Sequence, residues 1–161
     1  MSGKQKGFSL IELLIVVVII LVIAAVAIPN LLRSRMSANE ASAVASMRTM
    51  ITAEIIYSST YTVGFSADLP SLSDGGAPTN CIPPAVATAS SACLIDPNLA
   101  GGTKSGYLFA YQPGGGSTNS TYKLNADPIS LGSGQRHFYV DATNILRVNF
   151  TAPASPADPT L

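Results

Sequence analysis

Few residues in this chain have side chains that could carry out chemistry. The sequence has 161 residues, with a single histidine, two cysteines and nine acidic residues. His137 and Asp141 are four residues apart, which in a strand corresponds to about 13 Å, too far for a hydrogen bond. The segment Gly102–Ser105 lacks the upstream glycine and the Gly-Lys pair of a phosphate-binding loop. We therefore predict no catalytic residue, no cofactor and no metal ligand, and we expect that the chain is not an enzyme.

Glu12 is the most informative ionisable residue, because it lies within an apolar run. Only Ser9 and Glu12 are polar between Phe8 and Ile28. As a helix, this segment is about 31 Å long, which matches the hydrocarbon thickness of a membrane. A carboxylate inside such a span costs roughly 2.5–3.5 kcal/mol and usually has a function. Alternatively, Glu12 reaches the membrane interface, since it lies one turn from the end of the run.

Three interpretations of this segment stay open from the residues alone. It could be a plain membrane anchor. It could be a removable secretion signal, with Lys4 and Lys6 as its basic region and a cleavage site after the small residues 25–27. In the third interpretation Glu12 has a functional partner. Neither of the first two gives Glu12 a role.

The segment Lys6-Gly7-Phe8-Ser9-Leu10-Ile11-Glu12, followed by the apolar run and Pro29, resembles the N-terminus of type IV pilins and pseudopilins. The resemblance implies that a prepilin peptidase removes leader residues 1–7, cutting between Gly7 and Phe8, and methylates the new amino group of Phe8. It also implies storage in the inner membrane with a cytoplasmic leader, and then self-association into an extracellular helical filament through the inner-membrane assembly machinery.

Electrostatics gives this motif a mechanism. The amino group of Phe8, once released, is a cation that can approach Glu12 of a neighbouring subunit. In a core of low dielectric constant, such a pair offsets the cost of burying either charge alone. We therefore predict that Glu12 acts in assembly, where the ion pair sets the register of the docking subunit.

The helix is expected to continue beyond the apolar run. Pro29 predicts a kink or, alternatively, a helix end at Asn30. We prefer the kink, because apolar residues recur at helical spacing afterwards; Arg33, Arg35, Glu40, Arg48 and Glu54 lie largely off this stripe. The predicted stripe consists of Leu32, Met36, Ala43, Met47, Met50, Ile51 and Ile55. Segments 8–29 and 30–58 would then form one helix whose first half spans the membrane.

The remainder predicts an α+β body, in which the helix packs on a small antiparallel sheet, as in the pilin fold. Residues 60–105 read as loop, and no regular element is expected around Leu69 and Pro70. Strands are predicted by alternation at 106–112, 121–126, 136–140 and 145–150. We place the body at residues 59–151 and expect a flexible tail at 152–161, because its prolines disfavour regular structure.

Cys81 and Cys93 are the only cysteines. In an exported protein, an even count favours a disulfide, which would contribute about 3 kcal/mol by constraining the unfolded chain. A metal site would need more soft ligands at short spacing. Asn119 and Asn149 begin glycosylation sequons, which we interpret as ordinary polar residues. A calcium site built from the scattered aspartates 68, 74, 96, 127 and 141 would need their oxygens to converge.

Composition agrees with a membrane-anchored, exported protein. Only 11% of residues are charged, whereas 47% are hydrophobic, and the net charge is zero. This balance gives no basic footprint for nucleic acid. The leading hypothesis is a type IV pilin subunit. A pseudopilin of type II secretion shares the motif, although the Asp-Pro-Trp-Gly stretch usual in the major pseudopilin is replaced by Asp96-Pro97-Asn98. A membrane-anchored or secreted binding protein that does not assemble is the alternative of another class.

Overall fold

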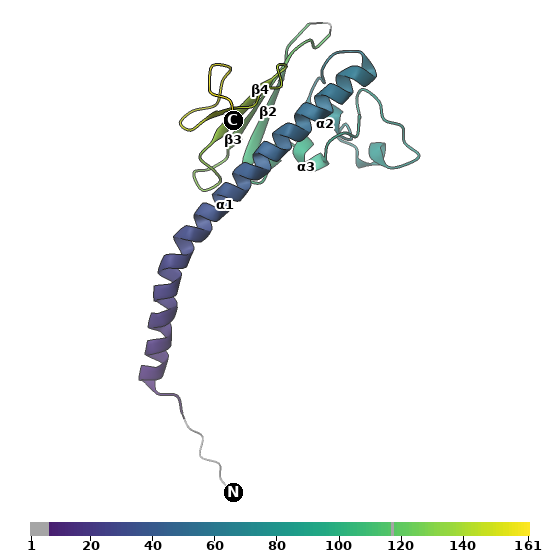
Figure 1. Cartoon of the computed structure of the whole chain (residues 1–161). Helices are drawn as coiled ribbons and strands as arrows, with labels where there is room; N and C mark the ends of the chain where they lie inside the picture. The colour runs from purple at the N-terminus through teal and green to yellow at the C-terminus, as the bar shows by residue number, and fades with distance from the viewer. Residues whose placement is uncertain (1–6, 117) are drawn as a thin grey trace. The chain divides into compact units, whose positions relative to one another are not determined.

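The computed structural model describes residues 7–116 and 118–161 of the chain. The predicted leader residues 1–6, with Lys4 and Lys6, therefore lie outside the described residues. The chain separates into two compact units, Met1–Arg35 and Met36–Leu161. Each unit is described by itself below. Helix α1 (Leu10–Tyr61) contributes residues to both (Figure 1).

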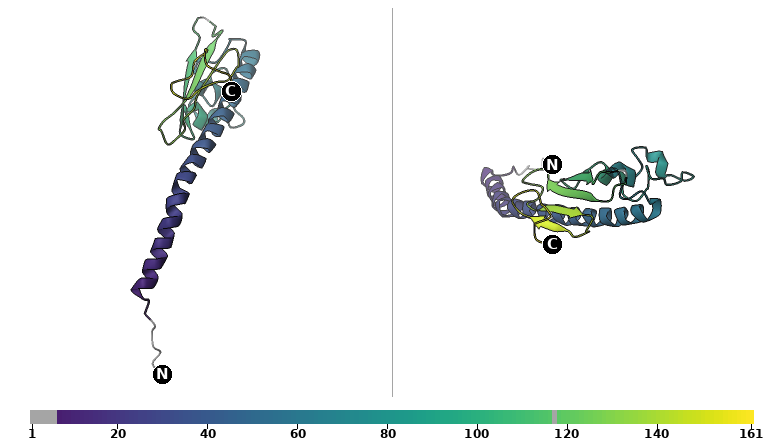
Figure 2. Two further views of the ribbon diagram at one scale, coloured as in Figure 1. Left: turned by 60° about the vertical axis from the view of Figure 1, so that its left-hand side comes forward. Right: turned by 90° about the horizontal axis from the view of Figure 1, so that it is seen from above.

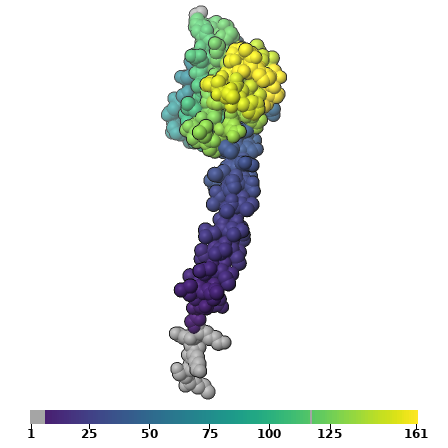
Figure 3. Space-filling view, turned by 90° about the vertical axis from the view of Figure 1, so that its left-hand side faces the viewer, coloured from purple at the N-terminus to yellow at the C-terminus, as the bar shows by residue number. Residues whose placement is uncertain are grey.

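The first unit consists of the apolar part of α1. Every large apolar side chain between Leu10 and Leu32 is exposed, and Figure 3 shows these side chains as the outer surface of a single helix. This is the one helix among the described residues that is long and apolar enough to cross a membrane. Water solvates such a surface poorly, so this part of α1 needs a lipid or protein environment.

The second unit begins with the polar half of α1. Its buried apolar residues recur every three or four positions, as expected for a helix with one face in the core: they are Ala43, Met47, Met50, Ala53 and Tyr57. The predicted stripe is correct at Ala43, Met47 and Met50 but wrong at Ile55, which is exposed. Glu40 and Glu54 were expected off the stripe; both are buried, because each has polar partners described below.

The sheet has five antiparallel strands in chain order. They are β1 (Thr103–Lys104), β2 (Tyr107–Pro113), β3 (Tyr122–Pro128), β4 (His137–Asp141) and β5 (Arg147–Asn149). The four predicted strand segments contain most of β2 to β5, whereas β1 was missed because two residues carry no alternation. The views in Figures 1 and 2 agree that the sheet lies along the α1 residues of this unit.

The core lies between one face of the sheet and α1. The inward side chains alternate along the strands, so that Tyr122, Leu124 and Ala126 of β3 are all buried. They form one apolar cluster with the buried stripe of α1 and with Leu72 and Leu99 from the long connection after α1. This arrangement confirms the predicted α+β class, with a long N-terminal helix packed on a small antiparallel sheet.

The connection from residue 62 to residue 102 contains short helical turns, so the prediction of no regular element near Leu69 is wrong. The turns are α2 (Leu69–Leu72), η1 (Pro78–Cys81) and α3 (Pro97–Ala100). Asp68 and Asp96 accept the backbone N–H of Ser71 and Leu99, respectively. Each aspartate therefore caps its turn, and each turn has a proline at its start, where the missing N–H costs nothing.

The C-terminal tail, which we expected to be flexible, forms hydrogen bonds with β5 and with the residue before it. The backbone N–H of Val148 in β5 donates to the carbonyl of Pro159, and that of Leu161 donates to Leu146. Ala154 is buried, and its carbonyl accepts the side-chain amide of Asn125. β5 is an edge strand of the sheet, and the tail supplies an acceptor for the Val148 N–H on its free edge, which would otherwise have no partner in the sheet. Prolines are tolerated beside an edge strand, although they have no N–H to donate.

Candidate functional site

The predicted cleavage site lies outside the helix, immediately before α1. Gly7, Phe8 and Ser9 have no helical assignment, and the Phe8 side chain is 83% exposed. Apart from Gly7 itself and its two chain neighbours, no heavy atom of the described residues lies within 4 Å of the position that a Cβ on Gly7 would occupy. The Gly7–Phe8 bond is therefore presented without steric cover, as a peptidase substrate requires. Cleavage and methylation at this bond remain predictions.

Glu12 closes the first turn of its own helix. One of its carboxylate oxygens accepts the backbone N–H of Ser9 at 3.0 Å, and the Ser9 carbonyl accepts the N–H of Glu12 at 3.1 Å. This is the side-chain-to-backbone half of a capping box, in which the residue at the third helical position reaches back to the N-cap. A negative charge here also faces the positive end of the helix dipole. The single subunit thus holds the carboxylate at the start of the apolar segment.

The helix does not end at Pro29, because α1 continues to Tyr61. Pro29 lacks the N–H that would bond the preceding turn. The side-chain amide of the next residue, Asn30, donates to the carbonyl of Val26 at 3.1 Å. This side chain gives the turn that contains Pro29 a hydrogen-bond donor besides its backbone N–H groups. The alternative of a loop beginning at Asn30 is wrong, whereas the kink at Pro29 stays a prediction.

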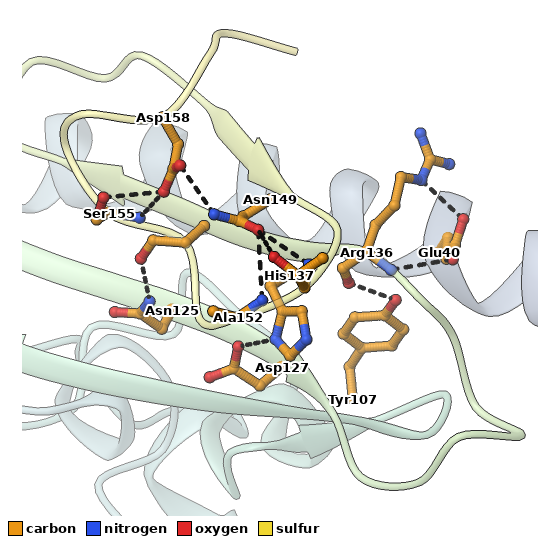
Figure 4. A network of polar contacts seen from close by, with 12 residues as sticks. Glu40, Tyr107, Asn125, Asp127, Arg136, His137, Asn149, Ala152, Ser155 and Asp158 are labelled. Carbon is orange, nitrogen blue, oxygen red and sulfur yellow. Dashed lines mark hydrogen bonds and ion pairs between the residues drawn. The ribbon is translucent and has the colours of Figure 1, made fainter.

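Glu40 anchors the β3–β4 loop to α1. Its carboxylate accepts the backbone N–H of Gln135 at 2.8 Å and that of Arg136 at 3.3 Å, and it pairs with Nε of Arg136 at 2.7 Å (Figure 4). Burial alone would raise the pKa of Glu40, but these donors outweigh burial and lower it below its usual value. On the other side, the hydroxyl of Tyr107 donates to the carbonyl of Arg136, and burial raises the pKa of Tyr107 to about 12.

Glu54 is the other buried carboxylate of α1, with 1% of its surface exposed. It accepts the backbone N–H of Ser66 at 3.0 Å and the hydroxyl of Ser66 at 2.6 Å. The hydroxyl of Tyr111 donates to the carbonyl of the same serine. Burial raises the pKa of Glu54, although the bonds from Ser66 oppose the shift. This cluster fixes the chain where it leaves α1.

The single histidine is not paired with Asp141 but with Asp127, which sequence spacing did not indicate. In the antiparallel register Ala126 faces Phe138, so the next positions, Asp127 and His137, are also opposite each other. Nδ1 of His137 lies 2.6 Å from a carboxylate oxygen of Asp127 (Figure 4). We expected His137 to be solvated; instead it is partly buried and oriented by a carboxylate.

The two cysteines are joined in the structure by a disulfide, Cys81–Cys93. The Cys93 end is also held by the backbone, because the N–H of Cys93 donates to the carbonyl of Ser73. The segment between the cysteines exposes Ile82 and Val86. The bond therefore closes a loop in which these two apolar side chains lie outside the core, whereas Ala92 packs in it.

The remaining polar candidates have local partners. The amide of Asn119 donates to the carbonyls of Phe65 and Ser66, and that of Asn149 donates to Asp158 (Figure 4). The five aspartates serve separate contacts: Asp68 and Asp96 cap helical turns, Asp74 and Asp141 accept nearby N–H groups, and Asp127 pairs with the histidine. In residues 7–116 and 118–161, no three acidic, histidine or cysteine side chains gather as metal ligands would.

Comparison with known proteins identifies the N-terminal segment. Residues 2–28 match the family described as the prokaryotic N-terminal methylation motif, which is the signature of type IV pilins and pseudopilins. No curated protein and no solved structure matches the chain. The match covers Gly7, Phe8 and Glu12 but none of the body. With the apolar helix, it indicates a membrane-anchored precursor of the type IV pilin or pseudopilin kind, a class of structural subunits.

Proposed function

We propose that this chain is a type IV pilin subunit. A prepilin peptidase cuts it between Gly7 and Phe8 and methylates Phe8, the subunit is held in the inner membrane, and an assembly machinery there adds it to an extracellular filament. The single observation that carries this proposal is the apolar part of α1, whose large side chains are all exposed and which holds Glu12 at its start.

The exposed apolar surface supports self-association. If the segment left the membrane, about twenty large and small apolar side chains would enter water, at a free-energy cost of roughly 25 cal/mol for each Å² of apolar surface exposed. The same segments of neighbouring copies can cover this surface. Successive copies related by a rotation and a translation give an open helical filament, because such contacts join two different surfaces of the chain.

The position of Glu12 supports ordered addition of subunits. In the single chain its carboxylate accepts only the Ser9 N–H among the described residues, so it retains capacity for further donors. The ammonium of Phe8 on a neighbouring copy is a donor of matching charge. Pairing these groups inside an apolar core removes the cost of two isolated charges, and it favours one axial register over others.

The body supports a pilus subunit over the major pseudopilin. The chain contains no tryptophan, and its Asp96-Pro97-Asn98 segment begins the capped turn α3. Asp96 pairs with Lys104 at 2.9 Å, so its carboxylate is already engaged with a cation of the chain. The body would form the outer surface of the filament. The contacts of this surface would then serve adhesion, motility or DNA uptake.

Intact-mass analysis of the chain from membranes and from sheared filaments tests this function. We expect a chain that begins at Phe8 and carries one additional methyl group. A chain that begins at Ile28 would demonstrate a secretion signal instead. Retention of Met1 in the membrane form would demonstrate a plain anchor. Either result would overturn the proposal.

A further inference from the structure

The body carries a second feature that the assembly function does not use, a depression of about 540 Å³ at one end of the sheet. Its walls come from the β3–β4 loop and from the segment that follows β5. The side chains that matter here are Ile129, Leu131, Gln135, His137, Phe150 and Thr151. This volume lies within the range of sites for small ligands.

The loop that forms one wall is fixed in place before any ligand arrives. The Ile129 N–H donates to the carbonyl of Gly106 at 2.9 Å, and the side chain of Asn39 donates to the carbonyl of Ser133 at 3.0 Å. The Glu40 carboxylate accepts the backbone N–H groups of Gln135 and Arg136. A rigid wall binds without the entropic cost of ordering a loop.

The two walls leave apolar side chains in water, although several backbone groups of the β3–β4 loop are hydrogen-bonded. Leu131 is 96% exposed, Phe150 66% and Ile129 60%. The Phe150 ring is the large aromatic surface of the depression. The backbone of the loop packs closely on Tyr107 at Gly134, where only a glycine fits: a Cβ on Gly134 would lie 2.1 Å from the hydroxyl oxygen of Tyr107.

Two polar side chains of the depression, Gln135 and His137, can form directional hydrogen bonds. Nδ1 of His137 lies against a carboxylate oxygen of Asp127, which leaves Nε2 for a ligand. The side-chain amide of Gln135 makes no hydrogen bond to any other described residue. Arg136, the nearest cation in sequence, is paired with Glu40. An anionic ligand such as phosphate would therefore find no unpaired cation among the lining residues.

We propose that this depression binds a neutral carbohydrate. A sugar ring has one face of C–H groups, which are weakly positive and suit the negative face of an aromatic ring. Its hydroxyls both donate and accept, so they can match an amide and either form of the free ring nitrogen of an imidazole. Phe150 would stack on the ring, while Gln135 and Nε2 of His137 would bond its hydroxyls. This inference goes beyond the proposed function and does not depend on filament assembly.

Saturation-transfer NMR on the full chain, with free hexoses and N-acetylhexosamines as probes, tests the proposal. The chain is held in zwitterionic micelles, because detergents with sugar headgroups would compete. We expect at least one sugar to bind with a Kd of about 1 mM. Phe150→Ala should weaken this binding roughly tenfold, as loss of an aromatic contact does, whereas Phe150→Tyr should retain it. Val86→Ala, which truncates an exposed apolar side chain outside the depression, should have no effect.

Several results would overturn the proposal. One is the absence of any transfer signal at about 100 mM sugar, a hundredfold excess over the expected Kd. A second is equal binding by the chain and by Phe150→Ala, which would locate the sugar elsewhere. A third is perturbation of residues 129–151 by raised protein concentration without sugar, which would identify the surface as a contact between copies. Near-ultraviolet circular dichroism of each variant verifies that the body is folded.

Discussion

The contact between Glu40 and the β3–β4 loop offers a quantitative test of the body's architecture. Glu40→Gln keeps the size of the side chain and one acceptor oxygen but removes the charge that faces Arg136. Hydrogen bonds to charged groups contribute about 1.5–3 kcal/mol. The Arg136 side chain is 32% exposed and that of Glu40 12%, so solvent screens part of this interaction. We expect the free energy of unfolding to fall by about 1–2 kcal/mol at neutral pH.

The matched control is Asp96→Asn, which removes the charge of an exposed ion pair. Asp96 and Lys104 have side-chain exposures of 42% and 36%, and pairs of this kind contribute about 0–1 kcal/mol. Asparagine also caps helices well, so the start of α3 should be retained. Urea unfolding of the full chain in micelles, followed by near-ultraviolet circular dichroism, gives both values.

Acid provides an independent arm of this test. The pKa of Glu40 is lowered in the folded chain, so its contribution is present above the unfolded value of about 4.5 and is lost as the pH falls through the folded pKa. The difference between the chain and Glu40→Gln should therefore shrink on acidification. A loss no larger than that of Asp96→Asn, or a difference unchanged by acid, would refute the anchoring role of Glu40.

Three further predictions concern the rest of the body. Glu54→Gln should flatten the pH dependence of the free energy of unfolding. Because the pKa of Glu54 is raised in the folded chain, its contribution to stability is complete below the unfolded value of about 4.5 and is lost as the pH rises through the folded pKa. The free energy of unfolding of the variant, measured with urea, should therefore not fall over that pH range. Replacing Cys81 and Cys93 by serine should lower the free energy of unfolding by about 3 kcal/mol; an unchanged urea midpoint would show that the backbone bonds suffice. Deleting residues 158–161 removes the acceptor of the Val148 N–H, so hydrogen exchange at Val148 should accelerate, and unchanged exchange would contradict the attachment of the tail.

Much of the fold could be predicted because its signals are local. The apolar run and the helical spacing of Ala43, Met47 and Met50 indicate α1, and alternation indicates β2 to β5. The cysteine count favours the disulfide that the structure contains. Each of these patterns lies within a few residues of sequence, which is the range over which periodicity can be read.

The errors arise where contacts between distant residues decide the structure. Glu40 and Glu54 lie off the predicted apolar stripe, and only the tertiary fold brings Gln135 and Ser66 to them. The pairing of His137 with Asp127 depends on the register of β3 and β4. The tail reads as flexible because of its prolines, yet its backbone exchanges hydrogen bonds with Val148 and Leu146. No local pattern reports such partners.

The central claim, that Glu12 directs assembly, is tested most directly by the ratio of this chain in sheared filaments to that in membranes. Leu14→Ala serves as the control, because it changes a comparably exposed side chain on the same helix. We predict that Glu12→Ala leaves membrane insertion intact and lowers the ratio at least about tenfold, since the Phe8 ammonium would be buried without its partner. Filaments formed equally well by Glu12→Ala and by Leu14→Ala would contradict this account.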